Sequence, residues 1–241
     1  MACCGTSNSR RSNAPPPAAS ASVSVADASA NPVRSPETRE QLIAIALPIF
    51  ARHGYDGAST RDIAQQAGVA LSAISYHFGG KPELFAAVAD RAARVMFAPL
   101  EAIVAEAGAR AAGGASPDDA GDMLVALVDA VAVSLLTTGH EAEAANQFGM
   151  RELAVGGVEM ARIGREVIDP IVGAASALLA CSRGGSAADH TIAATTLFGP
   201  ITLARLIHNR RLGDMTAPEA EGLIETVRSV SRRNAIMLAK G

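Results

Sequence analysis

Residues 54–85 read GYDGASTRDIAQQAGVALSAISYHFGGKPELF, and this stretch decides the fold of the chain. Ser59-Thr60 can cap a short helix, which Gly68 then ends. A second short helix is predicted from about Ala70 to His77, and Gly79-Gly80 ends it. Two short helices joined by a turn with glycine at its centre predict a helix-turn-helix.

Longer helices are predicted on both sides of this motif. Ser35-Pro36-Glu37 starts one with a capping hydroxyl, a first-turn proline and an acid near the positive end of the helix dipole. Gly54 ends that helix, and Lys81-Pro82-Glu83 starts the helix that follows the motif. We therefore predict a three-helix DNA-binding domain of the helix-turn-helix type over residues 35–95.

The second helix of such a motif lies in the major groove of DNA and reads base edges. Its predicted outer face here is small or uncharged, as expected of a surface that sits against base edges. The pattern alone also fits a helical hairpin of a bundle, in which Tyr76 and His77 are half-buried packing residues. The residues predicted to face DNA are Ala70, Leu71, Ser72, Ser75 and Tyr76.

This stretch resembles the DNA-binding domain of the TetR/AcrR family of transcriptional regulators. The resemblance implies a DNA-binding motif rather than a helical hairpin. It rests on Gly54, Tyr55, Ser59, Arg61, Ile63, Ala64, Ala67-Gly68-Val69, Tyr76-His77-Phe78, Lys81 and Leu84.

Matching positions in the family imply that Thr60, Tyr76, His77 and Lys81 contact DNA phosphates. All four side chains can donate hydrogen bonds to anionic oxygen. Lys81 lies at a helix N-terminus, where a cation is unfavourable unless a phosphate lies between it and the free backbone N–H groups. The alternative is a solvated surface lysine. Arg61 is long enough to reach either a base edge or a phosphate.

The chain departs from the family pattern at two places in the recognition helix. Many members carry two aromatic residues where this chain has Ser75-Tyr76, and Lys and Gly where it has Leu71 and Ser72. The chain therefore lacks one phosphate-facing aromatic residue and one cation of the family pattern, whereas Leu71 is suited to contact a thymine methyl group. These departures leave a second function open, a small-molecule-binding helical dimer with weakened or lost DNA binding.

Composition predicts an all-α fold for the whole chain. Of 241 residues, 49% are apolar but only 3% aromatic, which favours alanine- and leucine-rich helices over sheet. Residues 96–241 are predicted to form a larger helical ligand-binding and dimerisation domain. Within it we expect a loop over 108–115, a kink at Pro170, and final helices near 187–210 and 217–239, separated by Leu212-Gly213-Asp214.

Charge and composition divide the chain further. Residues 96–241 carry twelve Lys/Arg against seventeen Asp/Glu, so a nucleic-acid surface is expected in the first hundred residues. Residues 1–34 are rich in Ala, Ser and Pro and are predicted to be a disordered tail. Cys3, Cys4 and Cys181 suggest no disulfide framework or zinc site, which suits the cytoplasm. No apolar run reaches the roughly 18 residues that a membrane span needs.

The second half resembles the C-terminal domain of the CecR-like branch of the same family. Neither a catalytic motif nor a metal-ligand spacing is present, so we expect no enzyme, no cofactor and no metal. Polar residues of an otherwise apolar ligand cavity are expected at Gln147, Arg151 and Arg205, with structural salt bridges as the alternative. The resemblance rests on Gln147-Phe148, Arg151-Glu152, Glu166, Pro170, Gly199-Pro200-Ile201, Arg205 and Arg211-Leu212-Gly213.

Together these features predict a regulator that binds a palindromic DNA operator as a homodimer. It is expected to act as a repressor that a small apolar effector releases from DNA. The last two helices are predicted to form the dimer interface, because the final one carries an apolar stripe. The stripe could instead face the core of its own subunit. Its predicted interface residues are Leu223, Val227 and Val230.

Overall fold

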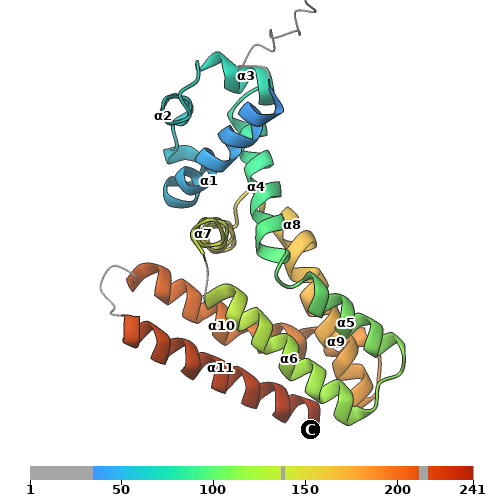
Figure 1. Ribbon diagram of the computed structural model, residues 1–241. Helices are drawn as coiled ribbons and strands as arrows, with labels where there is room; N and C mark the ends of the chain where they lie inside the picture. The colour runs from blue at the N-terminus through green and yellow to red at the C-terminus, as the bar shows by residue number, and fades with distance from the viewer. Residues whose placement is uncertain (1–34, 137–138, 212–216, 241) are drawn as a thin grey trace, which may run out of the picture. The chain divides into compact units, whose positions relative to one another are not determined.

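The structure is a computed structural model that describes residues 35–136, 139–211 and 217–240. The predicted tail over 1–34 and the predicted separator Leu212-Gly213-Asp214 lie outside these residues. Within them the secondary structure is helical throughout, with turns between the helices and no strand (Figure 1). The predicted all-α fold is therefore confirmed.

The N-terminal part contains the predicted helix-turn-helix between two longer helices. Ser35 Oγ accepts a hydrogen bond from the backbone N–H of Thr38 at 3.2 Å, and Ser59 Oγ accepts one from Asp62 N–H at 3.3 Å. Both predicted caps therefore start their helices. The elements are α1 (Pro36–Gly57), α2 (Thr60–Gln66), α3 (Ser72–Phe78) and α4 (Lys81–Phe97).

An aromatic cluster holds this part together. Phe50 of α1 meets Phe85 of α4 edge-on, with ring centroids 4.9 Å apart. Tyr55 and Phe148 pack against the same Phe85 ring at 5.1 Å and 5.2 Å. Because Phe148 lies in the second half of the chain, the core continues from the N-terminal helices into the larger helical region.

The larger region adds further helices, among them α7 (His140–Val155), which packs against α1 and α4. Helices α6, α10 and α11 pack against one another, as Figure 1 shows in green, orange and red. Its elements are α5 (Glu101–Ala112), α6 (Pro117–Leu136), α7 (His140–Val155), α8 (Met160–Ile163), the π-helical turn η2 (Gly164–Ile168), α9 (Asp169–Arg183), the 3₁₀ turn η3 (Ala187–His190), α10 (Thr191–Arg211) and α11 (Ala217–Lys240).

One local prediction needs correction. Helix α5 continues to Ala112, so most of the predicted loop over 108–115 is helical. Gly108 is exposed with open space around it, and its alanine-rich neighbours favour helix. Pro170 lies within a segment that is helical without a break from Met160 to Arg183, and it follows Asp169, the first residue of α9. The irregularity precedes it, in η2.

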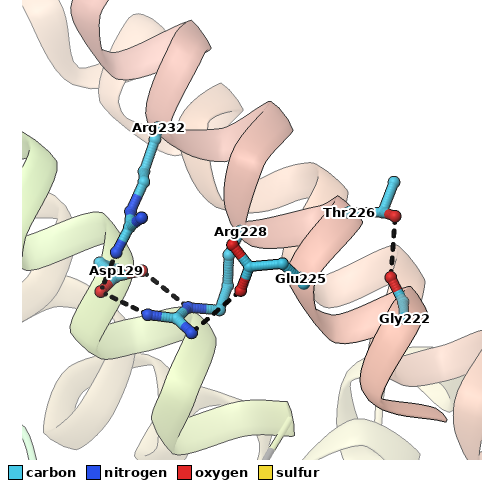
Figure 2. Close-up of polar contacts among 6 residues, drawn as sticks. All are labelled: Asp129, Gly222, Glu225, Thr226, Arg228 and Arg232. Atoms are coloured by element: carbon cyan, nitrogen blue, oxygen red, sulfur yellow. Dashed lines mark hydrogen bonds and ion pairs between the residues drawn. The ribbon is translucent and has the colours of Figure 1, made fainter. Parts of the chain in front are cut away.

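An ion-pair network joins α11 to α6 (Figure 2). Both carboxylate oxygens of Asp129 accept hydrogen bonds from Arg228, at 2.9 Å and 3.0 Å, and Arg232 adds a third at 2.8 Å. Glu225 pairs with the free side of Arg228 at 3.2 Å. The hydrogen bonds from Arg228 hold the pKa of Asp129 below its ordinary value, against the opposing effect of partial burial.

The same packing corrects the predicted dimer interface. Val227, Ser231 and Ala235 are buried at four-residue spacing, so this stripe of α11 faces the core of its own chain. Val227 is therefore unavailable to a symmetry mate, while Val230 is half-buried. The side chain of Leu223 lies outside the described residues. The large apolar side chains of α11 that remain exposed are Ile236 and Met237.

None of the described helices is on its own both long enough and apolar enough to cross a membrane. Two bent helix pairs, 117–136 with 141–155 and 160–183 with 187–207, reach that length and hydropathy only when taken together.

Candidate DNA-binding surface and ligand cavity

The turn between α2 and α3 fixes the orientation of the two helices. Gly68 adopts a φ of 67°, the left-handed conformation that ends α2 and that glycine adopts without strain. The next residue, Val69, donates its backbone N–H to the Ala64 carbonyl oxygen at 3.0 Å. Gln41 of α1 donates its side-chain amide to the Ala67 carbonyl oxygen at 3.2 Å, which ties the turn to the first helix.

Helix α3 presents one buried and one exposed face. Ala73, Ile74 and Phe78 pack into the core, so the opposite side of the helix faces outward. Leu71 and Tyr76 stand out there, because they are large side chains that remain 50% and 58% exposed. All five residues predicted to face DNA are exposed: Ala70, Leu71, Ser72, Ser75 and Tyr76.

The predicted phosphate-contacting residues lie at helix starts and on α3. Thr60 is half-buried at the start of α2, and Arg61 beside it is exposed. His77 is half-buried and meets the Tyr76 ring edge-on at 5.1 Å. All the residues predicted to contact phosphates therefore lie either in the helix-turn-helix or at the start of α4.

Lys81 makes a contact that the sequence pattern did not suggest. Its Nζ lies 4.7 Å from the centroid of the Tyr55 ring, a cation–π arrangement. Tyr55 is itself held by Phe85. The ammonium at the start of α4 is therefore positioned by the aromatic core. This contact leaves its N–H groups able to donate to an anion.

A cavity of about 460 Å³ lies among the helices of the larger region. Its lining residues come from α4, α6, α7, the α8–η2–α9 segment and α10, and most are Leu, Ile, Val, Met and Phe. Its size lies in the range of small-molecule sites. Among its described lining residues none is charged, and the polar side chains are those of Ser134, Asn146, Thr195 and Thr202.

The three residues predicted to line a cavity do not line this one. Gln147 is half-buried elsewhere on α7. Arg205 is fully buried and pairs with Glu143 at 2.6 Å, which is the salt-bridge alternative. Arg151 donates to the carbonyl oxygens of Arg52 and His53, at 3.5 Å and 3.4 Å, and so holds the end of α1.

Four residues of α7 that were not predicted line the cavity. They are Asn146, Gly149, Met150 and Leu153, whose spacing of three, one and three residues places them on one helix face. That spacing is a usable signal. The charged residues Arg151 and Glu152, which follow Met150, do not line the cavity.

The motif and its exposed α3 define the class of helix-turn-helix proteins. Residues 42–88 match the family model described as bacterial regulatory proteins, tetR family. Over these residues the chain is similar to the DNA-binding domain of that family.

Curated relatives match over short segments. The transcriptional dual regulator CecR of Shigella flexneri is 43% identical over 58 residues, which are 24% of this chain and 26% of CecR. The transcriptional repressor AcnR of Corynebacterium efficiens is 41% identical over 59 residues, 24% of this chain and 31% of AcnR. The matches thus span about a quarter to a third of these relatives, too little to test the resemblance of the second half to the CecR-like branch.

A longer likeness exists at the level of structure. The crystal structure of Mycobacterium smegmatis AmtR covers 86% of this chain and 89% of its own, with a TM-score of 0.51 and 21% sequence identity. At this identity the likeness concerns the fold alone.

Proposed function

We propose that the chain is a ligand-responsive transcriptional regulator, a repressor that binds a palindromic DNA operator as a homodimer and is released by a small apolar effector. The observation that carries the proposal is the exposed outer face of α3 within a TetR-family helix-turn-helix. The regulator and repressor names of the matched relatives support it. Such a protein works in the cytoplasm, where the DNA is.

On DNA, the proposed contacts divide into positioning and reading. Phosphate contacts position the protein, and base-edge contacts supply specificity. Tyr76, His77 and Lys81, together with Thr60, take the phosphates, and Arg61 takes either a phosphate or a base edge. Base reading belongs to Ala70, Leu71, Ser72 and Ser75.

The apolar cavity supports an effector site, and α7 connects it to the DNA-binding part. Met150 lines the cavity, and the next residue, Arg151, holds the last carbonyl groups of α1. A second connection runs through α8. Its Arg162 pairs with Asp90 of α4, and the residue after Arg162, Ile163, lines the cavity. A ligand that favours one arrangement of these helices over another changes the affinity for DNA.

The proposed homodimer uses α10 and α11. A single helix-turn-helix covers one half-site, which gives few contacts for specific binding, so two copies are needed. The apolar side chains left exposed on these helices support the assignment. They are Ile192, Leu203, Ile207, Ile236 and Met237.

The proposed function is tested by fluorescence anisotropy with labelled DNA from the region upstream of the protein's own gene. We expect binding at least about a thousandfold tighter than to unrelated DNA of the same length and salt concentration. Equal affinity for both would contradict the proposal and favour a ligand-binding dimer without DNA function.

A further inference from the structure

We propose that the cavity binds an uncharged, mostly apolar molecule that carries a hydroxyl or similar hydrogen-bond donor, and that the side-chain oxygen of Asn146 accepts that hydrogen bond. The inference rests on the proposed function only in taking the effector site to be this cavity. It adds the chemical class of the effector and the residue that selects it.

The lining excludes a charged ligand. None of the described lining residues carries a charge, so a carboxylate or ammonium would enter without a counterion. Burying an unpaired charge in an apolar site is far more costly than burying a hydroxyl that finds a partner. Arg162 bonds Glu159 and Asp90, and Arg205 bonds Glu143 through one Nη. The buried Nε of Arg205 has no hydrogen-bond partner within the described residues, but Arg205 does not line the cavity.

Asn146 provides the polar point of contact. It is 3% exposed and lines the cavity from α7. Its amide nitrogen donates to the Ser134 backbone carbonyl oxygen at 3.4 Å, and because that carbonyl can only accept, the nitrogen and oxygen of the amide are fixed in their places. Within the described part of the chain, the amide oxygen has no hydrogen-bond donor. A ligand hydroxyl in the cavity would supply one.

The other polar side chains of the cavity are less suited to this role. Thr195 is exposed and Thr202 is half-buried, so water competes for a hydrogen bond to either hydroxyl oxygen, whereas Asn146 is almost fully buried. Ser134 lies beside Asn146 in the lining. Its hydroxyl makes no hydrogen bond within the described residues, so it can donate to the oxygen of the same ligand hydroxyl. The polar end of the ligand is thereby placed between α6 and α7.

The test uses the full chain and displacement of the fluorescent neutral probe N-phenylnaphthylamine. Four competitors share one alkyl chain: decanol, decyl methyl ether, decanoate and decylammonium. At neutral pH we expect decanol to bind about tenfold more tightly than the ether, which cannot donate, because one buried hydrogen bond separates them. Decanoate and decylammonium should bind more weakly than either. Equal binding of decanol and the ether, or tighter binding of an ion, overturns the proposal.

Two variants assign the contact to its residue. Asn146→Leu should remove the advantage of decanol over the ether while the ether still binds. The matched control Thr202→Val deletes a half-buried lining hydroxyl that is not assigned to the ligand, so it should keep the advantage. An advantage that survives in Asn146→Leu refutes the role of Asn146. The comparison of competitors on the unmodified chain decides the ligand class even if Asn146→Leu does not fold.

The outcome of this test can be distinguished from the outcome of the DNA-binding experiment. Selective binding of decanol by a chain that does not recognise DNA supports this inference and contradicts the proposed function. Specific DNA binding by a chain whose cavity prefers an ion contradicts this inference and leaves the regulator proposal standing.

Discussion

At the scale of single residues, Lys81 is held in place by an aromatic ring. The contact with Tyr55 fixes an ammonium at the start of α4, beside the recognition helix that ends at Phe78. A fixed cation loses less conformational entropy when it meets a phosphate than a freely moving one. This makes Lys81 a good place to test how the DNA contacts are divided.

Replacing Lys81 by alanine should weaken binding to all DNA sequences to a similar degree. Because one phosphate contact is lost, the slope of log affinity against log salt should fall by about one. Anisotropy titrations at several salt concentrations measure both quantities. A loss confined to one DNA sequence would show that Lys81 reads bases.

Leu71→Ala should behave differently, since this exposed side chain carries no charge. We expect a changed preference at one base pair in each half-site, with an unchanged salt slope. A mismatched base pair in a binding site typically costs about 1–3 kcal/mol, which is the upper range expected for the loss of this contact. Binding to a set of single-base operator variants measures it. A uniform loss over all of them would contradict the assignment of Leu71 to base reading.

At the scale of elements, α7 is the helix that contacts most of the proposed machinery. It lines the cavity, packs against α4, and holds the end of α1 through Arg151. Gly54 lies where this contact occurs, with a φ of 71°, and a Cβ there would lie 2.5 Å from the Arg151 side chain.

Because Arg151 links α7 to α1 but does not line the cavity, Arg151→Met should leave the affinity for decanol unchanged and reduce the effect of decanol on DNA binding. Anisotropy with and without decanol measures this coupling, and an undiminished effect would contradict it.

The network around Asp129 predicts the acid sensitivity of the α6–α11 contact. The pKa of Asp129 is lowered in the folded state, chiefly by its hydrogen bonds with Arg228. The stability that this carboxylate contributes is thus present above its unfolded pKa of about 3.9 and is lost as the pH falls through its lower folded pKa.

Asp129→Asn should lower the unfolding free energy by about 1–2 kcal/mol at neutral pH and flatten its fall in acid. Urea unfolding across the acid range measures both effects. The control is Asp122→Asn, an exposed acid on the same helix that has no ion pair within the described residues. Equal acid profiles for the two variants would contradict the assignment.

The elements were largely predictable because their signals are local. Caps at Ser35 and Ser59 and the glycine at position 68 are read within a few residues, and the structure has all three. The contacts between elements were not predictable in this way, because they join residues that are far apart in the sequence. Periodicity identified an apolar stripe on α11 but could not say which neighbour covers it, so Val227 was assigned to a partner instead of the core. In the same way the cavity depends on five segments that no single pattern brings together.

At the scale of the whole molecule, the exposed apolar side chains of α10 and α11 should form the contact between two copies. Ile192 is 81% exposed and Met237 is 65% exposed. The double variant Ile192→Glu with Met237→Glu should give folded monomers, because it places like charges in an apolar interface. Sedimentation measures the mass and circular dichroism the folding.

Two controls sharpen this test. Val158→Glu changes an equally exposed apolar residue that lies between α7 and α8, and it should remain dimeric. Val227→Glu should unfold the chain instead of dissociating it, because Val227 is buried in the core. A dimer that survives the double variant would place the interface elsewhere.

The central claim is specific DNA recognition by the outer face of α3, and one titration tests it most directly. Anisotropy of the unmodified chain is measured on its own upstream region, with unrelated DNA as competitor and with decanol added at the end. The account predicts tight binding that unrelated DNA does not displace and that decanol reverses. Binding that unrelated DNA displaces equally well would contradict it.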